Sequence, residues 1–199
     1  YRALKVNNAV IADDGIEVAG AGRVLIKDNG ITNTGTSADY SLSNTHGGDG
    51  IHVRDAGNTR LYTRVALLEE IIPTNDLGVQ IIGNIISTTG DDGIEVSNSG
   101  KMLIDANSVS NAGAHGVLVG GTNNGSVLFS GNTITDTPVG ARFESGAIDL
   151  SDLTKPNRII NTDSSALPVG MQFDGSSENL TITNQTIGAT QFEGFQNAG

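Results

Sequence analysis

The sequence predicts an all-β protein: a single right-handed parallel β-helix of about seven rungs, each built from three short strands. Two observations lead to this prediction. A glycine followed by an apolar-x-apolar triplet recurs along the chain, and a side-chain amide recurs once per repeat between two further apolar segments. One rung cannot bury its apolar face alone, whereas stacked rungs close a continuous core. The right hand is the expectation from the sterics of parallel crossover connections.

The recurring glycine marks the first strand of each rung, because the triplet behind it alternates between two faces. The column runs through Gly15, Gly50, Gly93, Gly116, Gly140, Gly170 and Gly194. Longer gaps between some of these glycines indicate insertions, which we place at 36–47, 54–76 and 144–157. We expect one domain over residues 1–199, and we expect it to be a segment of a longer chain.

The recurring amide follows the second strand, and an aliphatic residue comes two positions after it. The amides are Asn29, Asn84, Asn107, Asn132 and Gln185. In a stacked solenoid they would lie about 4.8 Å apart at one corner, each bonding the next and satisfying the backbone of the turn. The amide column therefore predicts an asparagine ladder.

Composition limits the classes of partner and of chemistry. The net charge is -11, which disfavours nucleic acid and anionic membranes as partners. The chain has no run of 18 apolar residues, so we expect no membrane insertion. It also has no cysteine, which excludes disulfides and zinc-thiolate sites. Aromatic residues are only 4%, so the core must come mainly from Val, Ile and Leu.

Polar residues at two positions of the repeat point to possible chemistry. In register, they place a group of acidic and basic side chains on neighbouring rungs along one side: Asp49, His52, Asp91, Asp92, Glu95, His115 and Arg142. Carboxylates stacked about 5 Å apart raise one another's pKa, which suits a general acid or base. The candidate catalytic residues are Asp91, Asp92, His115 and Arg142. The candidate substrate-binding residues are Asp49, His52, Arg54, Tyr62 and Glu95, of which Arg54 and Tyr62 belong to the second insertion.

The repeat pattern as a whole resembles the pectate-lyase-like superfold of right-handed β-helix proteins. Within it, Gly-Asp-Asp at 90–92, Ala-His-Gly at 114–116 and Arg142 resemble motifs on successive turns of polygalacturonases. That resemblance implies that Asp91 and Asp92 supply catalytic carboxylates, and that His115 and Arg142 bind substrate or support the site. The same two rungs resemble mannuronan epimerases, which would map Asp92 and His115 onto the site. Asn-Thr-Asp occurs only downstream, at 161–163, and the epimerase Tyr-Gly-Phe-Asp-Pro-His-Glu motif is absent.

Two other interpretations of the same column stay open. Asp before Gly is common in tight turns, because the side chain bonds local backbone and glycine accepts a positive φ. Alternatively, Asp13, Asp14, Asp49 and Asp91 could hold Ca²⁺ together with turn carbonyls, since this ion prefers oxygen ligands. Calcium is the only cofactor that the sequence suggests.

The preferred functional prediction is an extracellular or cell-surface β-helix module, such as part of an adhesin, a secreted passenger domain or a filament scaffold. Its expected partners are a polysaccharide or neighbouring β-helix subunits. The first alternative is a polysaccharide-active enzyme, a polygalacturonase-like hydrolase or a uronate lyase or epimerase, that uses Asp92 and His115. The second alternative is a phage tail spike segment. Fold alone does not distinguish them.

Overall fold

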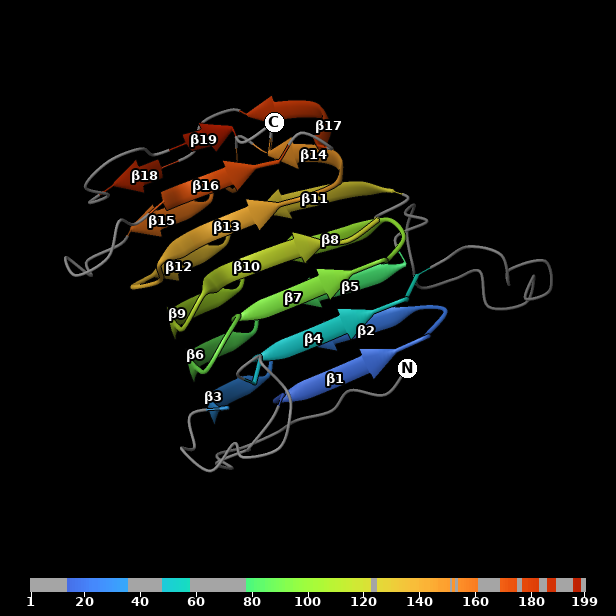
Figure 1. Ribbon diagram of the computed structural model, residues 1–199, viewed down its shortest axis with the longest axis vertical. Coiled ribbons are helices and arrows are strands. Elements are labelled where there is room, and N and C mark those ends of the chain that lie inside the picture. Colours follow the sequence, from blue (N-terminus) through green and yellow to red (C-terminus); the bar gives the residue numbers. More distant parts are fainter. Residues whose placement is uncertain are drawn as a thin grey trace.

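The computed structural model describes residues 14–35, 48–57, 78–122, 125–150, 152, 154–160, 169–174, 177–182, 186–188 and 195–197. In this part of the chain, all regular secondary structure is β-strand, and every strand pairing is parallel. The strands stack turn upon turn into a solenoid (Figure 1). The predicted fold class is therefore confirmed.

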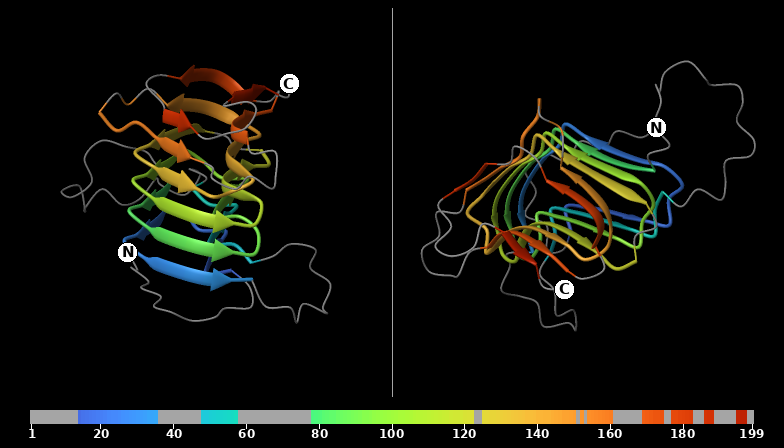
Figure 2. Two further views of the ribbon diagram at one scale, coloured as in Figure 1. Left: turned by 90° about the vertical axis from the view of Figure 1, so that its left-hand side faces the viewer. Right: turned by 90° about the horizontal axis from the view of Figure 1, so that it is seen from above.

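Each turn contributes one strand to each of three sheets, as the view along the axis in Figure 2 shows. The first sheet contains Ile16–Ala19 (β1), Ile51–Arg54 (β4), Ile94–Ser97 (β7), His115–Gly120 (β10), Val139–Phe143 (β13), Val169–Phe173 (β16) and Phe195–Asn197 (β19). The second contains Val24–Lys27 (β2), Val79–Ile82 (β5), Met102–Asp105 (β8), Ser126–Ser130 (β11), Gly146–Leu150 (β14) and Ser177–Ile182 (β17). The third contains Gly30–Thr34 (β3), Ile85–Thr89 (β6), Ser108–Ala112 (β9), Thr133–Thr135 (β12), Arg158–Ile160 (β15) and Thr186–Gly188 (β18).

The core lies inside the solenoid and consists of stacked columns of mainly aliphatic side chains. The predicted triplets are in register, so that Ile51 pairs with Ile94 and Ile94 with Val117. These side chains are buried, and their outward neighbours are not. Toward the later rungs aromatic rings enter the core: Phe143 packs edge-on against Phe129 and stacks on Phe173.

The glycine column is required by lack of space. A Cβ on Gly93 would overlap a methyl group of Val109 and lie 2.6 Å from the carbonyl oxygen of Gly116, and the equivalent glycines of other rungs are equally confined. None of Gly15, Gly50, Gly93, Gly116 and Gly140 has a positive φ. We expected these positions to need glycine for a positive φ, and they do not. They need glycine because successive rungs pack too closely to leave room for a Cβ.

The chain turns the corners through left-handed residues at other positions. One such column follows the strands of the second sheet and contains Asp28, Gly83, Ala106 and Gly131. A second follows the strands of the first sheet, and a third lies at the ends of the third-sheet strands. Glycine, Asn and Asp dominate these positions because they adopt a positive φ most easily.

The asparagine ladder forms as predicted along the described rungs. The side-chain Nδ2 of each asparagine donates to Oδ1 of the next at 2.9–3.0 Å, from Asn29 through Asn84 and Asn107 to Asn132. The next member is Asn157, which accepts from Asn132 at 2.9 Å, whereas Gln185 lies outside the described residues. At the other end of the ladder, Oδ1 of Asn29 accepts no hydrogen bond from the residues that the structure describes.

The position of Asn157 corrects one predicted insertion. Segment 144–157 contains β14, which pairs with β11 and β17, so most of it belongs to a regular rung. Seven residues separate Asp149 from Asn157, whereas three separate the paired Leu128 from Asn132, so four extra residues precede Asn157. Insertion 36–47 and residues 58–76 of the second insertion lie outside the described residues, and residues 54–57 continue the rung that contains β4.

Candidate functional site

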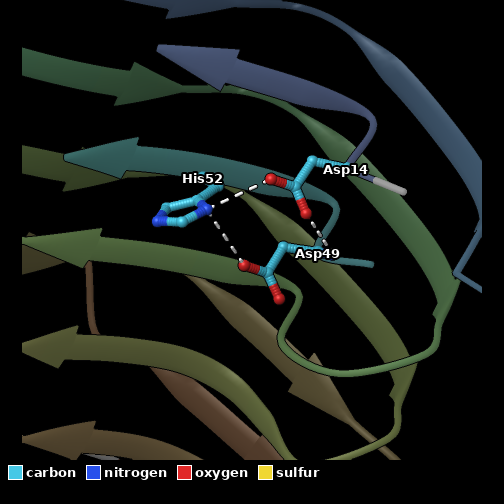
Figure 3. Close-up of side chains that lie close together, drawn as sticks. All are labelled: Asp14, Asp49 and His52. Atoms are coloured by element: carbon cyan, nitrogen blue, oxygen red, sulfur yellow. Dashed lines mark hydrogen bonds and ion pairs between the residues drawn. The ribbon is translucent and has the colours of Figure 1, made fainter. Parts of the chain in front are cut away.

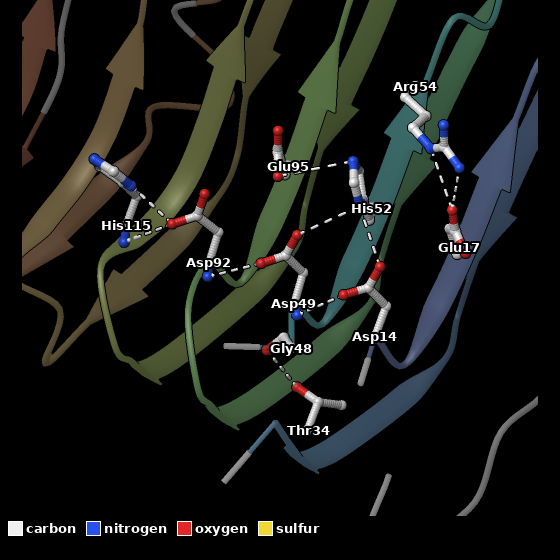
Figure 4. Close-up of polar contacts among 10 residues, drawn as sticks. All are labelled: Asp14, Glu17, Thr34, Gly48, Asp49, His52, Arg54, Asp92, Glu95 and His115. Atoms are coloured by element: carbon white, nitrogen blue, oxygen red, sulfur yellow. Dashed lines mark hydrogen bonds and ion pairs between the residues drawn. The ribbon is translucent and has the colours of Figure 1, made fainter. Parts of the chain in front are cut away.

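The residue before the column glycine is polar in the first four rungs, and these side chains form a second polar ladder at one corner of the solenoid (Figure 4). Oδ1 of Asp14 accepts a hydrogen bond from the backbone N–H of Asp49 at 2.9 Å. Oδ1 of Asp49 accepts from the N–H of Asp92, and Oδ1 of Asp92 from the N–H of His115, both at 3.0 Å. We call Asp14, Asp49 and Asp92 the aspartate ladder. Each member holds the backbone of the next rung.

His115 ends the ladder and contacts it with its side chain as well. Its Nδ1 lies 2.7 Å from Oδ1 of Asp92, so the imidazole N–H donates to the carboxylate. Asp92 is 3% exposed, whereas His115 is partly exposed at the surface. The predicted pairing of Asp92 with His115 is therefore present, and it joins a buried carboxylate to an accessible imidazole.

His52 lies among three carboxylates. Its Nδ1 is 3.1 Å from Oδ2 of Asp14 and 3.7 Å from Oδ2 of Asp49 (Figure 3). On the other side of the ring, Nε2 is 3.8 Å from Oε2 of Glu95 (Figure 4). The imidazole projects from β4 between the first rung and the third, so one histidine contacts acidic groups from three rungs.

Burial and mutual repulsion dominate the electrostatics of this cluster. Burial, together with the charge of Asp92, raises the pKa of Asp49 to about 9, and the charges of Asp14 and Glu95 act in the same direction. The hydrogen bond to Asp14 raises the pKa of His52. Burial raises the pKa of Asp14, but hydrogen bonds from His52 and from the Asp49 N–H outweigh it and lower the pKa overall.

The two candidate arginines contact carboxylates away from Asp92 and His115. Arg142 lies near the end of β13, and its guanidinium is 2.9 Å from Asp174 and 3.1 Å from Glu144. His115 lies at the beginning of β10, at the opposite end of the neighbouring strand. The structure therefore does not bring Arg142 together with Asp92 and His115. Arg54 forms an exposed ion pair with Glu17 at 2.8 Å.

The remaining candidates fall in different places. The carbonyl oxygen of Asp91 accepts hydrogen bonds from the N–H of Ala114 and the hydroxyl of Thr89. Asp13 and Tyr62 lie outside the described residues. In the described part of the chain, the groups that could hold a metal are Asp14 with Asp49 and His52, and Asp49 with Asp92 and Glu95. Of the residues predicted to hold calcium, Asp14 and Asp49 are in these groups and Asp91 is in neither.

Three contacts of the candidate residues were not predicted from the sequence. His52 contacts Asp14 of the previous rung, and Arg142 pairs with Asp174 and Glu144. The repeat register contains the signal for the first contact, because β4 pairs with β1 and His52 is the outward residue of its triplet. Asp174 follows β16, in the rung whose repeat pattern is weakest.

This geometry permits proton transfer at Asp92 and His115, but it uses the same oxygen of Asp92 to hold a backbone N–H. Arg142, the candidate cation for a polyanionic substrate, pairs with Asp174 instead, so it supplies no positive charge beside Asp92 and His115.

The described residues contain no helix long and apolar enough to span a membrane.

Comparison with known proteins identifies the fold family. A family model described as a right-handed beta helix region matches residues 70–198, which is well over half of the chain. The right-handed coil of this family agrees with the hand that we expected from the sterics of parallel crossover connections. A search of curated proteins and a search of solved structures each found no match.

Proposed function

Because this chain belongs to the right-handed β-helix family, we propose that it is an extracellular or cell-surface module that binds a glycan through one outer face and has no catalytic role. The single observation that carries this proposal is the aspartate ladder. Asp14, Asp49 and Asp92 each accept a backbone N–H of the next rung, so the most enzyme-like feature of the sequence has a structural use.

The third sheet offers the best binding face. The outward residues of β3, β6, β9 and β12 form two columns without any charged side chain: Gly30, Ile85, Ser108 and Thr133, and Thr32, Ser87, Ser110 and Thr135. We call these residues the hydroxyl face. Strand pairing places its hydroxyls about 4.8 Å apart along the axis, and Ile85 is 64% exposed among them.

A neutral polysaccharide fits this face better than an acidic one. The chain carries a net charge of -11, so a polyanion would be repelled. Sugar hydroxyls can exchange hydrogen bonds with a row of Ser and Thr side chains, and an exposed aliphatic side chain can pack against the C–H face of a sugar ring. A flat sheet with repeated hydroxyls would accommodate several sugar units of one chain.

A binding assay with insoluble neutral polysaccharides tests the proposal. Ser110→Glu places a charge in the middle of the hydroxyl face, and we expect it to weaken retention about tenfold. Gln80→Glu adds the same charge to the outward side of β5, in the second sheet, and should leave retention unchanged. Equal retention of both variants, or no retention of the wild-type chain, would contradict a glycan-binding role for this face.

A second candidate function is supported by one observation, the 2.7 Å contact between Asp92 and His115. In a polysaccharide-active enzyme the buried carboxylate would orient the imidazole, and the accessible imidazole would transfer a proton to or from the sugar. Glu95 lies near the same corner and offers a further carboxylate.

Turnover of polygalacturonate or alginate would establish this second candidate. The wild-type chain should then release reducing ends or unsaturated products, and His115→Gln should reduce kcat about 100-fold or more while the melting temperature stays within a few degrees. Arg142→Gln is the matched control, because its ion pairs lie at the opposite end of the strands. The surface module predicts no turnover by any of these proteins.

A further inference from the structure

We propose that Asp14, Asp49 and His52 bind a divalent transition-metal ion, with Zn²⁺ as the best fit. The three side chains come from the first and second rungs and lie on the outer side of the corner (Figure 3). The site lies apart from the hydroxyl face of the third sheet and is independent of the proposed glycan binding.

The distances between the donor atoms suit one small ion. Zinc binds nitrogen and carboxylate oxygen at about 2.0–2.2 Å, and a tetrahedral arrangement then separates two ligand atoms by about 3.4 Å. Nδ1 of His52 lies 3.1 Å from Oδ2 of Asp14 and 3.7 Å from Oδ2 of Asp49. These two separations lie on either side of the expected value, so small side-chain adjustments bring all three atoms to one ion.

The carboxylates are oriented for this role by the aspartate ladder. Oδ1 of Asp14 and Oδ1 of Asp49 are each fixed by a backbone N–H of the next rung. Their Oδ2 atoms both point toward His52 (Figure 3). Asp49 is buried, and its Oδ2 is 3.7 Å from Nδ1 of His52, so the two groups interact as an ion pair across a distance too long for a hydrogen bond. A cation placed between the two carboxylates would offset their mutual repulsion.

Glu95 completes the arrangement on the far side of the imidazole. Metal-binding histidines usually direct their second nitrogen to a carboxylate or carbonyl group, which fixes the ring orientation. Nε2 of His52 faces Oε2 of Glu95 at 3.8 Å. Glu95 thus acts as a positioning residue, and the nitrogen donor favours zinc or another transition metal over calcium, which prefers oxygen ligands alone.

Calorimetric titration of the untagged, chelator-stripped chain with ZnCl₂ tests the proposal. We expect one Zn²⁺ per chain, and a melting temperature about 5–10 °C higher when free Zn²⁺ is 100 times Kd. His52→Gln should weaken binding at least tenfold. Glu95→Gln should weaken it about tenfold, as expected for a group that orients a ligand. CaCl₂ should give no comparable heat.

His115→Gln is the matched control, because it changes the other histidine of the same corner and should leave the zinc affinity unchanged. Equal losses in His52→Gln and His115→Gln, calcium affinity without zinc affinity, or no zinc binding would each overturn the proposal. If His52→Gln does not fold, as judged by circular dichroism, Asp14→Asn decides the question. It keeps an oxygen for the Asp49 N–H and should still lose zinc affinity at least tenfold.

Discussion

Two polar ladders run along this β-helix, and their side chains differ in the hydrogen bonds that they can donate and accept. An asparagine both donates and accepts, so each amide of the asparagine ladder satisfies its neighbour. An ionised aspartate only accepts, so the aspartate ladder must take its donors from the backbone. Stacking acidic groups in this way brings carboxylates close together at the corner, whereas the amide stack has no ionisable group.

The stability of the metal-free protein should fall as pH rises. The pKa of Asp49 is about 9 in the folded chain against an ordinary value of 3.8. The stabilisation of the folded chain that this shift provides is therefore fully present below about pH 4 and is lost as pH rises toward 9. The raised pKa of His52 has the same sign, and the lowered pKa of Asp14 acts only in acid. Melting temperatures measured in chelator should therefore decrease between about pH 5 and pH 9.

Two variants test the assignment of this pH dependence to Asp49. Asp49→Asn keeps an oxygen for the Asp92 N–H and cannot ionise, so its melting temperature should vary much less with pH. Asp28→Asn changes an exposed aspartate at another corner and should keep the wild-type pH dependence. A wild-type stability that rises toward pH 9 would contradict the raised pKa.

Removing one amide from the asparagine ladder should be strongly destabilising. Asn107→Ala deprives the side-chain amide and the backbone N–H of Asn84 of their acceptor, and it removes the side-chain donor to Oδ1 of Asn132 and to the carbonyl of Ile81. We expect a loss of roughly 2–4 kcal/mol in the free energy of unfolding by denaturant titration. Asn111→Gly is the control, because Asn111 is exposed at φ 54° and glycine adopts this conformation freely. Similar losses in both variants would refute the ladder argument.

At the scale of the strand and its corner, glycine has two separate uses in this chain. In the column before the first-sheet strands it allows rungs to approach, as at Gly93. At the left-handed corners it permits a positive φ, as at Gly83 and Gly131. A substitution therefore has a different physical meaning in each column.

Gly93→Ala should destabilise the protein by about 1–3 kcal/mol, because the added methyl group meets Val109 and the carbonyl of Gly116. Gly30→Ala is the matched control. Gly30 lies on β3 with a negative φ and open space around the Cβ position, so this substitution should be neutral or slightly stabilising. Chemical denaturation of both variants checks the comparison, and an equal effect would show that space is not the reason for the glycine column.

Ala106→Gly should stabilise the chain by about 0.5–1 kcal/mol. Ala106 is exposed at φ 55°, a conformation that costs an L-residue roughly 1–2 kcal/mol and costs glycine nothing. Ala19→Gly makes the same change at an exposed strand position and should destabilise by roughly 0.5–1 kcal/mol. The two substitutions should therefore shift the denaturation midpoint in opposite directions, and shifts of the same sign would contradict the strain at this corner.

The sequence predicted the elements well where the repeat spacing is regular, and less well elsewhere. The register of β4, β7 and β10 follows directly from the triplets. Asn157 was not predicted as a ladder residue, because four extra residues separate it from its apolar pair on β14.

Side-chain partners at the candidate site were less predictable than the register. The repeat placed Asp92 beside His115 correctly, since both precede the column glycine. It could not show that the ladder uses Asp49 to hold the next rung, because an aspartate before glycine is equally common in solvated turns. The partners of Arg142 could not be predicted, because the repeat fixes only its register, whereas Asp174 and Glu144 lie outside the triplets.

At the scale of the whole molecule, acidity acts against a compact solenoid. The chain has a net charge of -11, and its long axis stacks like charges on successive rungs. Exposed ion pairs such as Arg54 with Glu17 offset little of this repulsion. The solenoid relies on backbone pairing and its aliphatic core to remain folded under this charge.

Salt should therefore stabilise the protein. Raising NaCl from about 20 mM to about 200 mM screens repulsion between charges more than roughly 10 Å apart, and we expect the melting temperature at pH 8 to rise by a few degrees. Arg54→Gln removes one cation and should increase this salt response. A melting temperature that falls with added salt would show that attractive pairs outweigh the net charge.

The hydrogen bonds of the asparagine ladder all run in one direction. Each amide nitrogen donates to the amide oxygen of the later rung, and the series begins at Asn29, whose amide oxygen accepts no hydrogen bond from the described residues. The solenoid is thus a polar rod whose two ends are chemically different. A rung added at the Asn29 end would extend the series only if its amide donated in the same sense. Association of two such rods along the axis would then be heterologous and head to tail, which produces open-ended fibres and not closed pairs.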